Sequence, residues 1–327
     1  MRHVNLHSAC AMAAATLVSA AAHAQPSTAP FPNKPIMVIV PFAAGGPVDL
    51  ETRMYLPRMA ELLGTQFVTD YKPGAGTSVG AGLVAKARPD GYTLLSDSAA
   101  LAVFPAFYKD LPFDILKDLA PLSMMSTKTS VLMVPPSSPI KTFAEYLAYT
   151  KANPGKVNYG TSGVGDISHL SGAWLHSLAG TTVAFVPYKG NGPMILELIA
   201  GRLDIASASP IASLPLIRAG KLRPLAVKGP HRIKQMPDVP TVSEHNMPEY
   251  SDQNWQGFLA PAGTPAPIVA RLSEAMIKVT KIPSIVSDLE SQASTAIGST
   301  PAEFRKFIAE DVSRWEKVVQ STNIRLQ

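Results

Sequence analysis

Two glycine-rich segments carry the residue types best suited to binding an anion. The first, PFAAGGPVD, covers residues 41–49, and the second, GTSGVGD, covers residues 160–166. Each follows a short run typical of a strand and precedes a pattern typical of a helix, so backbone N–H groups and the positive end of the helix converge on one place. The predicted ligand-binding residues of these segments are Phe42, Ala43, Ala44, Gly45, Gly46, Asp49, Thr161, Ser162, Gly163, Val164, Gly165 and Asp166. A plainer interpretation of the first segment is a tight turn with Asp49 as helix N-cap.

The chain matches several motifs of catalysis and nucleotide binding only in part. The GAGT stretch at residues 74–77 lacks the lysine of a phosphate-binding loop, and Val164 breaks the G-x-S-x-G pattern of serine hydrolases. Ser162, Asp166 and His169 share one helical entry, where no separate group could align the base of a catalytic triad. We therefore predict that the protein is not an enzyme, with no catalytic residue, no metal and no cofactor.

The elements that position the two segments alternate between strand and helix. Residues 36–42 form a continuous apolar run, as in a strand buried on both faces, and a helical pattern over residues 49–63 ends at Gly64. Further strands are predicted at residues 66–71, 92–96, 131–134, 157–160, 184–186, 204–206 and 224–227. Such alternation predicts an α/β fold with largely parallel sheets.

Helix boundaries are marked by capping signals. Residues 142–145 read as a capping box for a helix reaching Ala152, and other helices are expected to end at Gly180, Gly201 and Gly220. About 70 residues at the end are predicted to be mostly helical, with an N-cap at Thr300 followed by proline and, at the third helical position, glutamate.

The start of the chain indicates export. Arg2 precedes an uncharged, alanine-rich stretch, and Ala22-His23-Ala24 provides an A-x-A cleavage site. We predict a signal peptide over residues 1–24 and a periplasmic mature chain that begins at Gln25 and lacks Cys10. The net charge of +5 does not indicate a nucleic-acid partner, because the densest basic stretch, residues 221–234, is interrupted by apolar residues and contains no aromatic side chain.

Motifs distributed over nearly the whole mature chain resemble those of one known family. In order they are FPNKPIMVIVPFAAGGPVD, KPGAGTSVGA, ARPDGYTLL, LPFD with KDLAPL, KANPGKVNYGTSG, HLSGAWL, VPYKGNGPMILELIAGRLD, AGKLRPLAV, MPDVPTVSE and GFLAPAGTP. A chain with these ordered matches resembles the Bug family, the extracytoplasmic solute receptors of tripartite tricarboxylate transporters.

The resemblance implies a fold and a mode of action. It implies the fold of type II periplasmic binding proteins, with two α/β lobes of mixed, mainly parallel sheets joined by two hinge crossovers and closing over a ligand. The first lobe would comprise residues 26–127 and 253–327, and the second residues 128–252. We expect a monomer that passes a small organic acid to the membrane subunits of a transporter, and no nucleic-acid partner. A ligand-sensing lobe that signals to a membrane kinase is the alternative, and an enzyme on the same scaffold is a weaker one.

The resemblance also implies where the ligand lies. In the family, backbone groups and ordered waters from the loops matching residues 41–49 and 161–168 hold a carboxylate, and Ser98, Tyr188 and Lys189 would lie near the cleft. A surface salt bridge is the plainer role for Lys189. Asp166 stands where the family usually has Ser or Thr, and Ala208 with Ser209 stands where it often has Asp and Asn. Lys72 also replaces a customary Arg, and Phe104 a customary Asn. These departures affect the ligand rather than the fold.

Asp166 has two interpretations. As a helix N-cap it would occupy N–H donors and complement the helix dipole. Facing the cleft, its charge would repel an anionic group. We therefore expect a ligand whose carboxylate lies against residues 42–46 and whose other end is neutral or cationic, such as an amino acid, an aromatic monocarboxylate or an amide-bearing acid.

Overall fold

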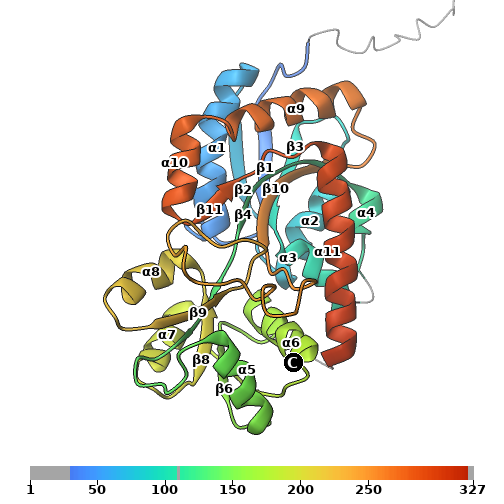
Figure 1. Cartoon of the computed structure of the whole chain (residues 1–327). Coiled ribbons are helices and arrows are strands. Elements are labelled where there is room, and N and C mark those ends of the chain that lie inside the picture. The colour runs from blue at the N-terminus through green and yellow to red at the C-terminus, as the bar shows by residue number, and fades with distance from the viewer. Residues whose placement is uncertain (1–29, 109–110, 323–327) are drawn as a thin grey trace, which may run out of the picture.

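A computed structural model describes residues 30–108 and 111–322, which form two β-sheets with helices against their faces (Figure 1). The six-stranded sheet has the order β11-β4-β10-β3-β1-β2, and the five-stranded sheet has the order β7-β6-β8-β5-β9. The strands are β1 (Ile36–Val40), β2 (Phe67–Tyr71), β3 (Thr93–Ser98), β4 (Leu119–Lys128), β5 (Val131–Val134), β6 (Asn158–Thr161), β7 (Ala184–Pro187), β8 (Ile205–Ala208), β9 (Arg223–Val227), β10 (Asn254–Pro261) and β11 (Ser294–Ala296). The predicted signal peptide and Cys10 lie outside the described residues.

Both sheets are mixed, which confirms the predicted α/β class. Parallel pairs join β1 to β2 and β3, and β6 to β7 and β8. Antiparallel pairs join β10 to β3 and β4, β11 to β4, and β5 to β8 and β9. Antiparallel pairing is more extensive than the mainly parallel sheets predicted, because three strands of the larger sheet, β4, β10 and β11, had not been foreseen.

The helices are longest in the first lobe, which carries the six-stranded sheet. They are α1 (Pro47–Leu63), α2 (Ser78–Ala85), α3 (Ala100–Val103), α4 (Ile115–Asp118), α5 (Phe143–Ala152), α6 (Ile167–Ala179), α7 (Asn191–Ile199), α8 (Pro210–Arg218), α9 (Ala266–Val279), α10 (Pro283–Ser291) and α11 (Pro301–Thr322), with two short 3-10 turns at Ala75–Thr77 and Phe104–Ala106. The N-caps of the predicted capping box at residues 142–145 and of the helix after Thr300 are confirmed: Glu145 N–H donates to Thr142 Oγ1 over 3.1 Å, and Glu303 N–H donates to Thr300 Oγ1 over 3.3 Å. No helix in the described residues is both long enough and apolar enough to span a membrane.

Strand β1 is buried on both faces, as its apolar sequence predicted, except at Met37, which is 42% exposed. Ile36, Val38 and Val40 pack with α1 and α9, whereas Ile39 packs into the core on the opposite face, where α11 lies. A pleated strand sends successive side chains to opposite faces, so β1 contributes to two cores at once. This burial fixes the carboxyl end of β1, from which the first glycine-rich loop departs.

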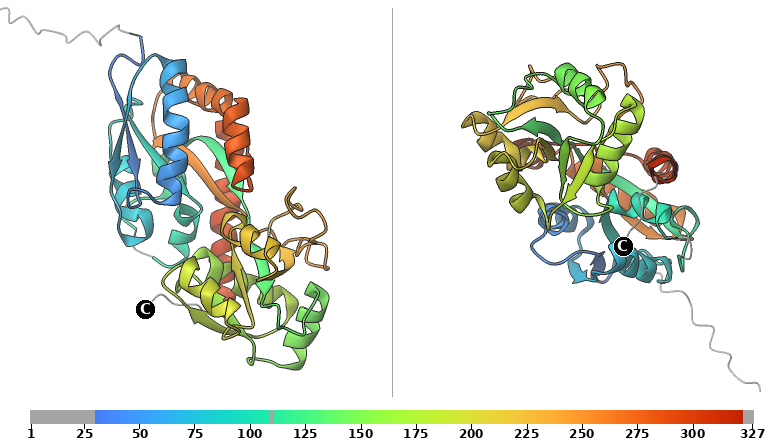
Figure 2. Two further views of the ribbon diagram at one scale, coloured as in Figure 1. Left: turned by 90° about the vertical axis from the view of Figure 1, so that its left-hand side faces the viewer. Right: turned by 90° about the horizontal axis from the view of Figure 1, so that it is seen from below.

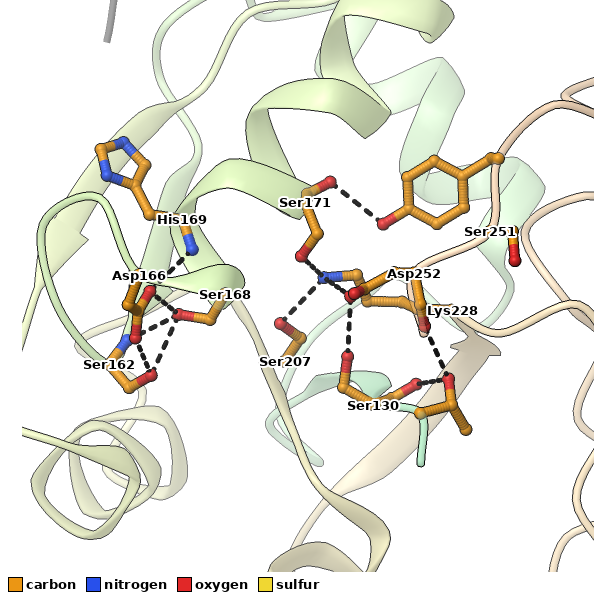
Figure 3. A network of polar contacts seen from close by, with 12 residues as sticks. Ser130, Ser162, Asp166, Ser168, His169, Ser171, Ser207, Lys228, Ser251 and Asp252 are labelled. Carbon is orange, nitrogen blue, oxygen red and sulfur yellow. Dashed lines mark hydrogen bonds and ion pairs between the residues drawn. The ribbon is translucent and has the colours of Figure 1, made fainter. Parts of the chain in front are cut away.

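The two lobes are joined by two crossings of the chain. One runs from β4 to β5, and the other from β9 to β10; they meet where Lys228 N–H donates to the carbonyl of Ser130 over 2.9 Å. The side chain of Lys228 is fully buried and forms an ion pair with Asp252 at 3.1 Å, with hydrogen bonds to Ser171 and Ser207 (Figure 3). A buried charge is tolerated only with partners of this kind, so this cluster fixes the crossings relative to α6 and β8.

Helix α11 reaches from the first lobe to the second. In the views of Figure 2 its carboxyl-terminal half lies beside α6, and the rings of Trp315 and Trp174 meet edge to face with centroids 6.0 Å apart. Arg314 lies over the Trp174 ring and donates to the carbonyl of Ser251 in the second crossing. The start of α6 therefore belongs to a helix that is anchored to both lobes.

Candidate ligand-binding site

A cavity of about 750 Å³ is lined by loops from both lobes. This volume is in the range of small-molecule sites in proteins. Seven of the predicted site residues line it: Phe42, Ala43, Gly46, Ser98, Val164, Gly165 and Asp166. The others do not: Ala44, Gly45, Asp49, Thr161, Ser162, Gly163, Tyr188, Lys189 and Ala208. The two glycine-rich segments do face one cavity, and which of their residues contact a ligand stays a prediction.

The first glycine-rich loop leads into α1 without a side-chain cap. Gly46 is the N-cap residue, with no side-chain hydrogen bond at the helix start, and Pro47 follows as the first helical residue. The first N–H groups of a helix have no intrahelical acceptor, and the helix dipole places partial positive charge there. Because Gly46, Pro47 and Val48 line the cavity, this uncapped helix end opens onto it.

Asp49 shapes this loop instead of capping the helix, so the plainer interpretation of it as N-cap is wrong. It lies inside α1, is fully buried, and accepts hydrogen bonds from Gly45 N–H (2.7 Å), Tyr71 Oη (2.8 Å) and Arg53 Nε (2.9 Å). Burial alone would raise the pKa of Asp49, but these hydrogen bonds and the Arg53 charge hold it below its ordinary value. The ionised carboxylate ties the loop back onto the helix that follows it.

The second glycine-rich loop leads into α6 with a charged cap. Asp166 is the N-cap residue, and its Oδ1 accepts from His169 N–H over 3.0 Å and from the Ser168 hydroxyl over 2.7 Å (Figure 3). Its Oδ2 accepts from the Ser162 hydroxyl. Asp166 also lines the cavity, so both sequence-based interpretations describe it: it caps the helix and presents negative charge to the cavity.

The contacts of His169 rule out the imagined catalytic triad. Its Nδ1 accepts from Gly165 N–H over 3.1 Å, whereas the Ser162 hydroxyl donates to Asp166 rather than to the imidazole. Burial lowers the pKa of His169, although the nearby Asp166 charge opposes this, so the ring is held in the neutral form that can accept a hydrogen bond. The half-buried ring packs against Phe185 and closes the loop.

One wall of the cavity is aromatic, and of its residues the sequence indicated only Phe104. Phe104, Phe107 and Tyr108 line the cavity beyond the end of β3, and the rings of Phe104 and Tyr108 stack at 4.2 Å with an interplanar angle of 16°. Gly76, in a left-handed conformation, lies so close beneath Phe104 that a Cβ there would come within 2.9 Å of the ring. The run ALAVFPAFY at the carboxyl end of a predicted strand was the signal available for this wall.

Ser98 lines the cavity next to a fully buried carboxyl group. Burial raises the pKa of the preceding residue, Asp97, to about 8, although a hydrogen bond from Ser98 N–H over 2.7 Å opposes the shift. At neutral pH Asp97 is therefore protonated. The first-lobe side of the cavity consequently carries no negative charge at this position.

Polar side chains from three neighbouring strands line the end of the cavity near the hinge. They are Lys128 of β4, Asn254 of β10 and Ser294 of β11. Lys128 Nζ also donates to Glu51 of α1, whose other oxygen accepts from Ser126 and, over 2.9 Å, from Tyr55 Oη. Sequence reasoning missed these residues because it did not foresee the three strands that carry them.

The remaining predicted residues lie outside the cavity wall. Lys189 is exposed, and Tyr188 packs against the core of the second lobe while its N–H donates to the carbonyl of Thr161 over 2.9 Å. Ala208 is buried in the same core, and its neighbour Ser209 lines the cavity. In the residues that the structure describes, no group of three or more His, Cys, Asp or Glu side chains is placed to hold a metal ion.

Comparison with known proteins identifies the family. The model of the tripartite tricarboxylate transporter family receptor matches residues 52–324. The chain belongs to this family. The chain is similar to the protein BugT of Bordetella pertussis, with 33% identity over 299 residues that cover 91% of this chain and 92% of BugT. The family is one of transporter receptors, and a similar solved protein from Polaromonas is a TctC solute-binding protein, which confirms the prediction that this chain is not an enzyme.

Solved structures agree in fold. The chain is similar to a periplasmic transporter, with 39% identity, a TM-score of 0.75, and coverage of 91% of this chain and 100% of that one. It is also similar to Rpa4515 of R. palustris, solved with adipate, with 30% identity, a TM-score of 0.75, and coverage of 90% and 99%. The predicted two-lobe architecture of periplasmic solute-binding proteins is thus confirmed.

Proposed function

We propose that this receptor captures a small organic acid in the cavity between its lobes, with the carboxylate of the ligand at the start of α1. The observation that carries the proposal is the uncapped amino-terminal end of α1, which opens onto a cavity lined from both lobes. Backbone N–H groups at such a helix end are suited to an anion. A relative solved with adipate supports a carboxylate as the ligand.

The other side of the cavity favours a ligand with a single negative charge. Asp166 contributes a carboxylate to the cavity wall and occupies donors at the start of α6. Two like charges in a site of restricted water repel one another. The aromatic wall of Phe104, Phe107 and Tyr108 supplies apolar surface for the body of the ligand. A monocarboxylate with an apolar or aromatic body and a neutral or cationic tip fits this arrangement.

The wider setting of the protein completes the proposal. We propose an exported monomer, cleaved after Ala24, that delivers its ligand to the membrane subunits of a tripartite tricarboxylate-type transporter. The lobes would divide at residues 127–128 and 252–253, beside the buried ion pair of Lys228 and Asp252. Mass analysis of the amino terminus of periplasmic protein tests the cleavage site: a chain that retains Cys10 would contradict it.

Thermal melting against a panel of mono-, di- and tricarboxylates tests the binding function. A ligand bound only by the folded protein adds RT ln(1 + [L]/Kd) to the free energy of unfolding, about 2.7 kcal/mol at one hundred times Kd. We expect the melting temperature to rise with the concentration of at least one monocarboxylate, and the ligand to be recovered unchanged. If every acid leaves the melting temperature unmoved, the proposal is wrong.

A further inference from the structure

Three polar side chains form a continuous row at the hinge end of the cavity. Lys128 lies directly opposite Asn254 in the β4–β10 pair and directly opposite Ser294 in the β4–β11 pair. Residues opposite one another in an antiparallel pair project from the same face of the sheet, with Cβ atoms about 5 Å apart. The three side chains, which we call the polar row, therefore act on one part of the cavity.

The polar row offers both donors and an acceptor. The Lys128 ammonium has three N–H groups, and one of them donates a hydrogen bond to Glu51. The Oδ1 atom of Asn254 is buried and has no hydrogen-bond partner among the described residues, although Asn254 lines the cavity. A buried acceptor left without a donor is costly, so a ligand that donates to this atom, once the amide group turns it toward the cavity, would remove the cost. The hydroxyl of Ser294, whose residue is only 5% exposed, can donate or accept.

The charges of the polar row cancel. The carboxylate of Glu51, a residue 4% exposed, lies against the Lys128 ammonium and balances its charge. A second carboxylate on the ligand would thus meet no net positive charge here, and it would share the cavity with Asp166. A neutral group that both donates and accepts hydrogen bonds fits the row better than an anion does.

We propose that the polar row binds a carboxamide at the far end of the ligand, whose carboxylate lies at the start of α1. This assignment rests on the proposed function and specifies the ligand class as a monocarboxylic acid with a terminal amide. The carboxamide N–H₂ donates to Asn254 Oδ1, and its oxygen accepts from the Lys128 ammonium or the Ser294 hydroxyl. Only β3 separates β10 from β1, so Asn254 lies about 10 Å from the strand that leads into the first glycine-rich loop, and Lys128 and Ser294 lie one and two strand spacings farther away.

Two matched series of ligands test the carboxamide assignment by calorimetric titration. The aliphatic series is hexanoate, the monoamide of adipic acid, and adipate; the aromatic series is benzoate, 4-carbamoylbenzoate and terephthalate. We expect the amide in at least one series to bind about tenfold more tightly than both its relatives, because only it satisfies the polar row without adding a charge. If hexanoate or benzoate binds and the amides bind no more tightly, the assignment is wrong while the acid-binding function stands. If none of the six binds, both are wrong.

Variants of the polar row distinguish a contact with the ligand carboxamide from a general effect on folding. Asn254→Leu should remove the preference for the amide over the unsubstituted acid. Asn158→Ala, at an exposed residue of β6, is the matched control and should retain the preference. Since Lys128→Met alone would leave Glu51 buried and unpaired, the double variant Glu51→Gln with Lys128→Met is used, and it should also lose the preference. Unchanged selectivity in Asn254→Leu and in the double variant would overturn the assignment.

Discussion

The starts of α1 and α6 face the same cavity and differ in how they are capped. At α1 the N-cap residue is Gly46, and the nearest carboxylate, Asp49, is turned away to hold Gly45, Arg53 and Tyr71. At α6 the N-cap residue is Asp166, whose carboxylate takes three hydrogen bonds from the helix start and its loop. One helix end is left open for an anion, and the other already carries one.

This difference makes the cavity electrostatically asymmetric, with the helix end at α1 more favourable to an anion than the one at α6. A helix end attracts anions through free N–H groups and partial positive charge, and a carboxylate cap neutralises both contributions. Two loops with similar glycine content are therefore not equivalent, and the ligand should enter with its carboxylate toward α1. Asp97 supports the contrast, because its raised pKa keeps this carboxyl group beside Ser98 uncharged at neutral pH.

Giving α1 a charged N-cap like that of α6 should have the largest effect on ligand affinity. Gly46 has φ −74° and ψ 166°, which any residue can adopt, and a Cβ there would lie 3.3 Å from the carbonyl of Ala43. Gly46→Asp should weaken monocarboxylate binding by roughly a hundredfold, or about 2.7 kcal/mol, because it occupies the donors and adds a like charge. Gly46→Asn, which caps without charge, is the control and should lose less, as measured by calorimetry. Equal affinities for wild type and Gly46→Asp would show that the carboxylate does not lie at α1.

Replacing the charged N-cap of α6 with the hydroxyl usual in the family should have a smaller effect on ligand affinity. Asp166→Ser keeps a capping oxygen but removes the charge, so the preference should shift toward a dianion by about tenfold, or 1.4 kcal/mol. Affinities for hexanoate and adipate, measured side by side, give the ratio, and Asp166→Asn should shift it in the same direction. If wild type already prefers adipate and neither variant changes the ratio, Asp166 acts only as a cap.

Raising the pH should reduce the electrostatic difference between the two sides of the cavity, because Asp97 loses its proton. The carboxyl ionises near 3.8 when unfolded and near 8 when folded, so between these values only the unfolded state loses its proton. The contribution of Asp97 to the free energy of unfolding should therefore fall by about 1.4 kcal/mol per pH unit across this interval, and level off above it. Above pH 8 the new charge beside Ser98 should also weaken monocarboxylate binding several-fold. Asp97→Asn should remove both effects in chemical denaturation and titration. A variant whose stability follows the wild-type pH profile would show that Asp97 is ionised throughout.

The parts of the fold that local sequence specifies could be predicted. An unbroken apolar run defines β1, Gly64 ends α1 in a left-handed conformation, and Thr142 with Glu145 begins α5. Each of these signals acts over a few residues, through side-chain burial or a cap. The two glycine-rich loops could be found for the same reason, because strand, turn and helix follow one another directly.

The strands and site residues that could not be predicted depend on contacts between segments that are distant in the sequence. Strands β4 and β10 contain Pro121 and Gly257, which weaken a strand pattern, and they are strands because each is paired on both sides within the sheet. Without them, Lys128, Asn254 and Ser294 could not be placed together. Likewise, nothing local distinguishes Tyr188 and Ala208, which pack into the second-lobe core, from Ser209, which lines the cavity.

The direction of the bound acid is tested most directly by a crystal structure of the protein with 4-bromobenzoate. Anomalous scattering from the bromine marks one end of the ligand and leaves no ambiguity about the other. The asymmetric cavity predicts the carboxylate within about 3 Å of backbone N–H groups at the start of α1, with the bromine directed away from it. A carboxylate bound at the start of α6, with Asp166 displaced from its cap, would contradict the account.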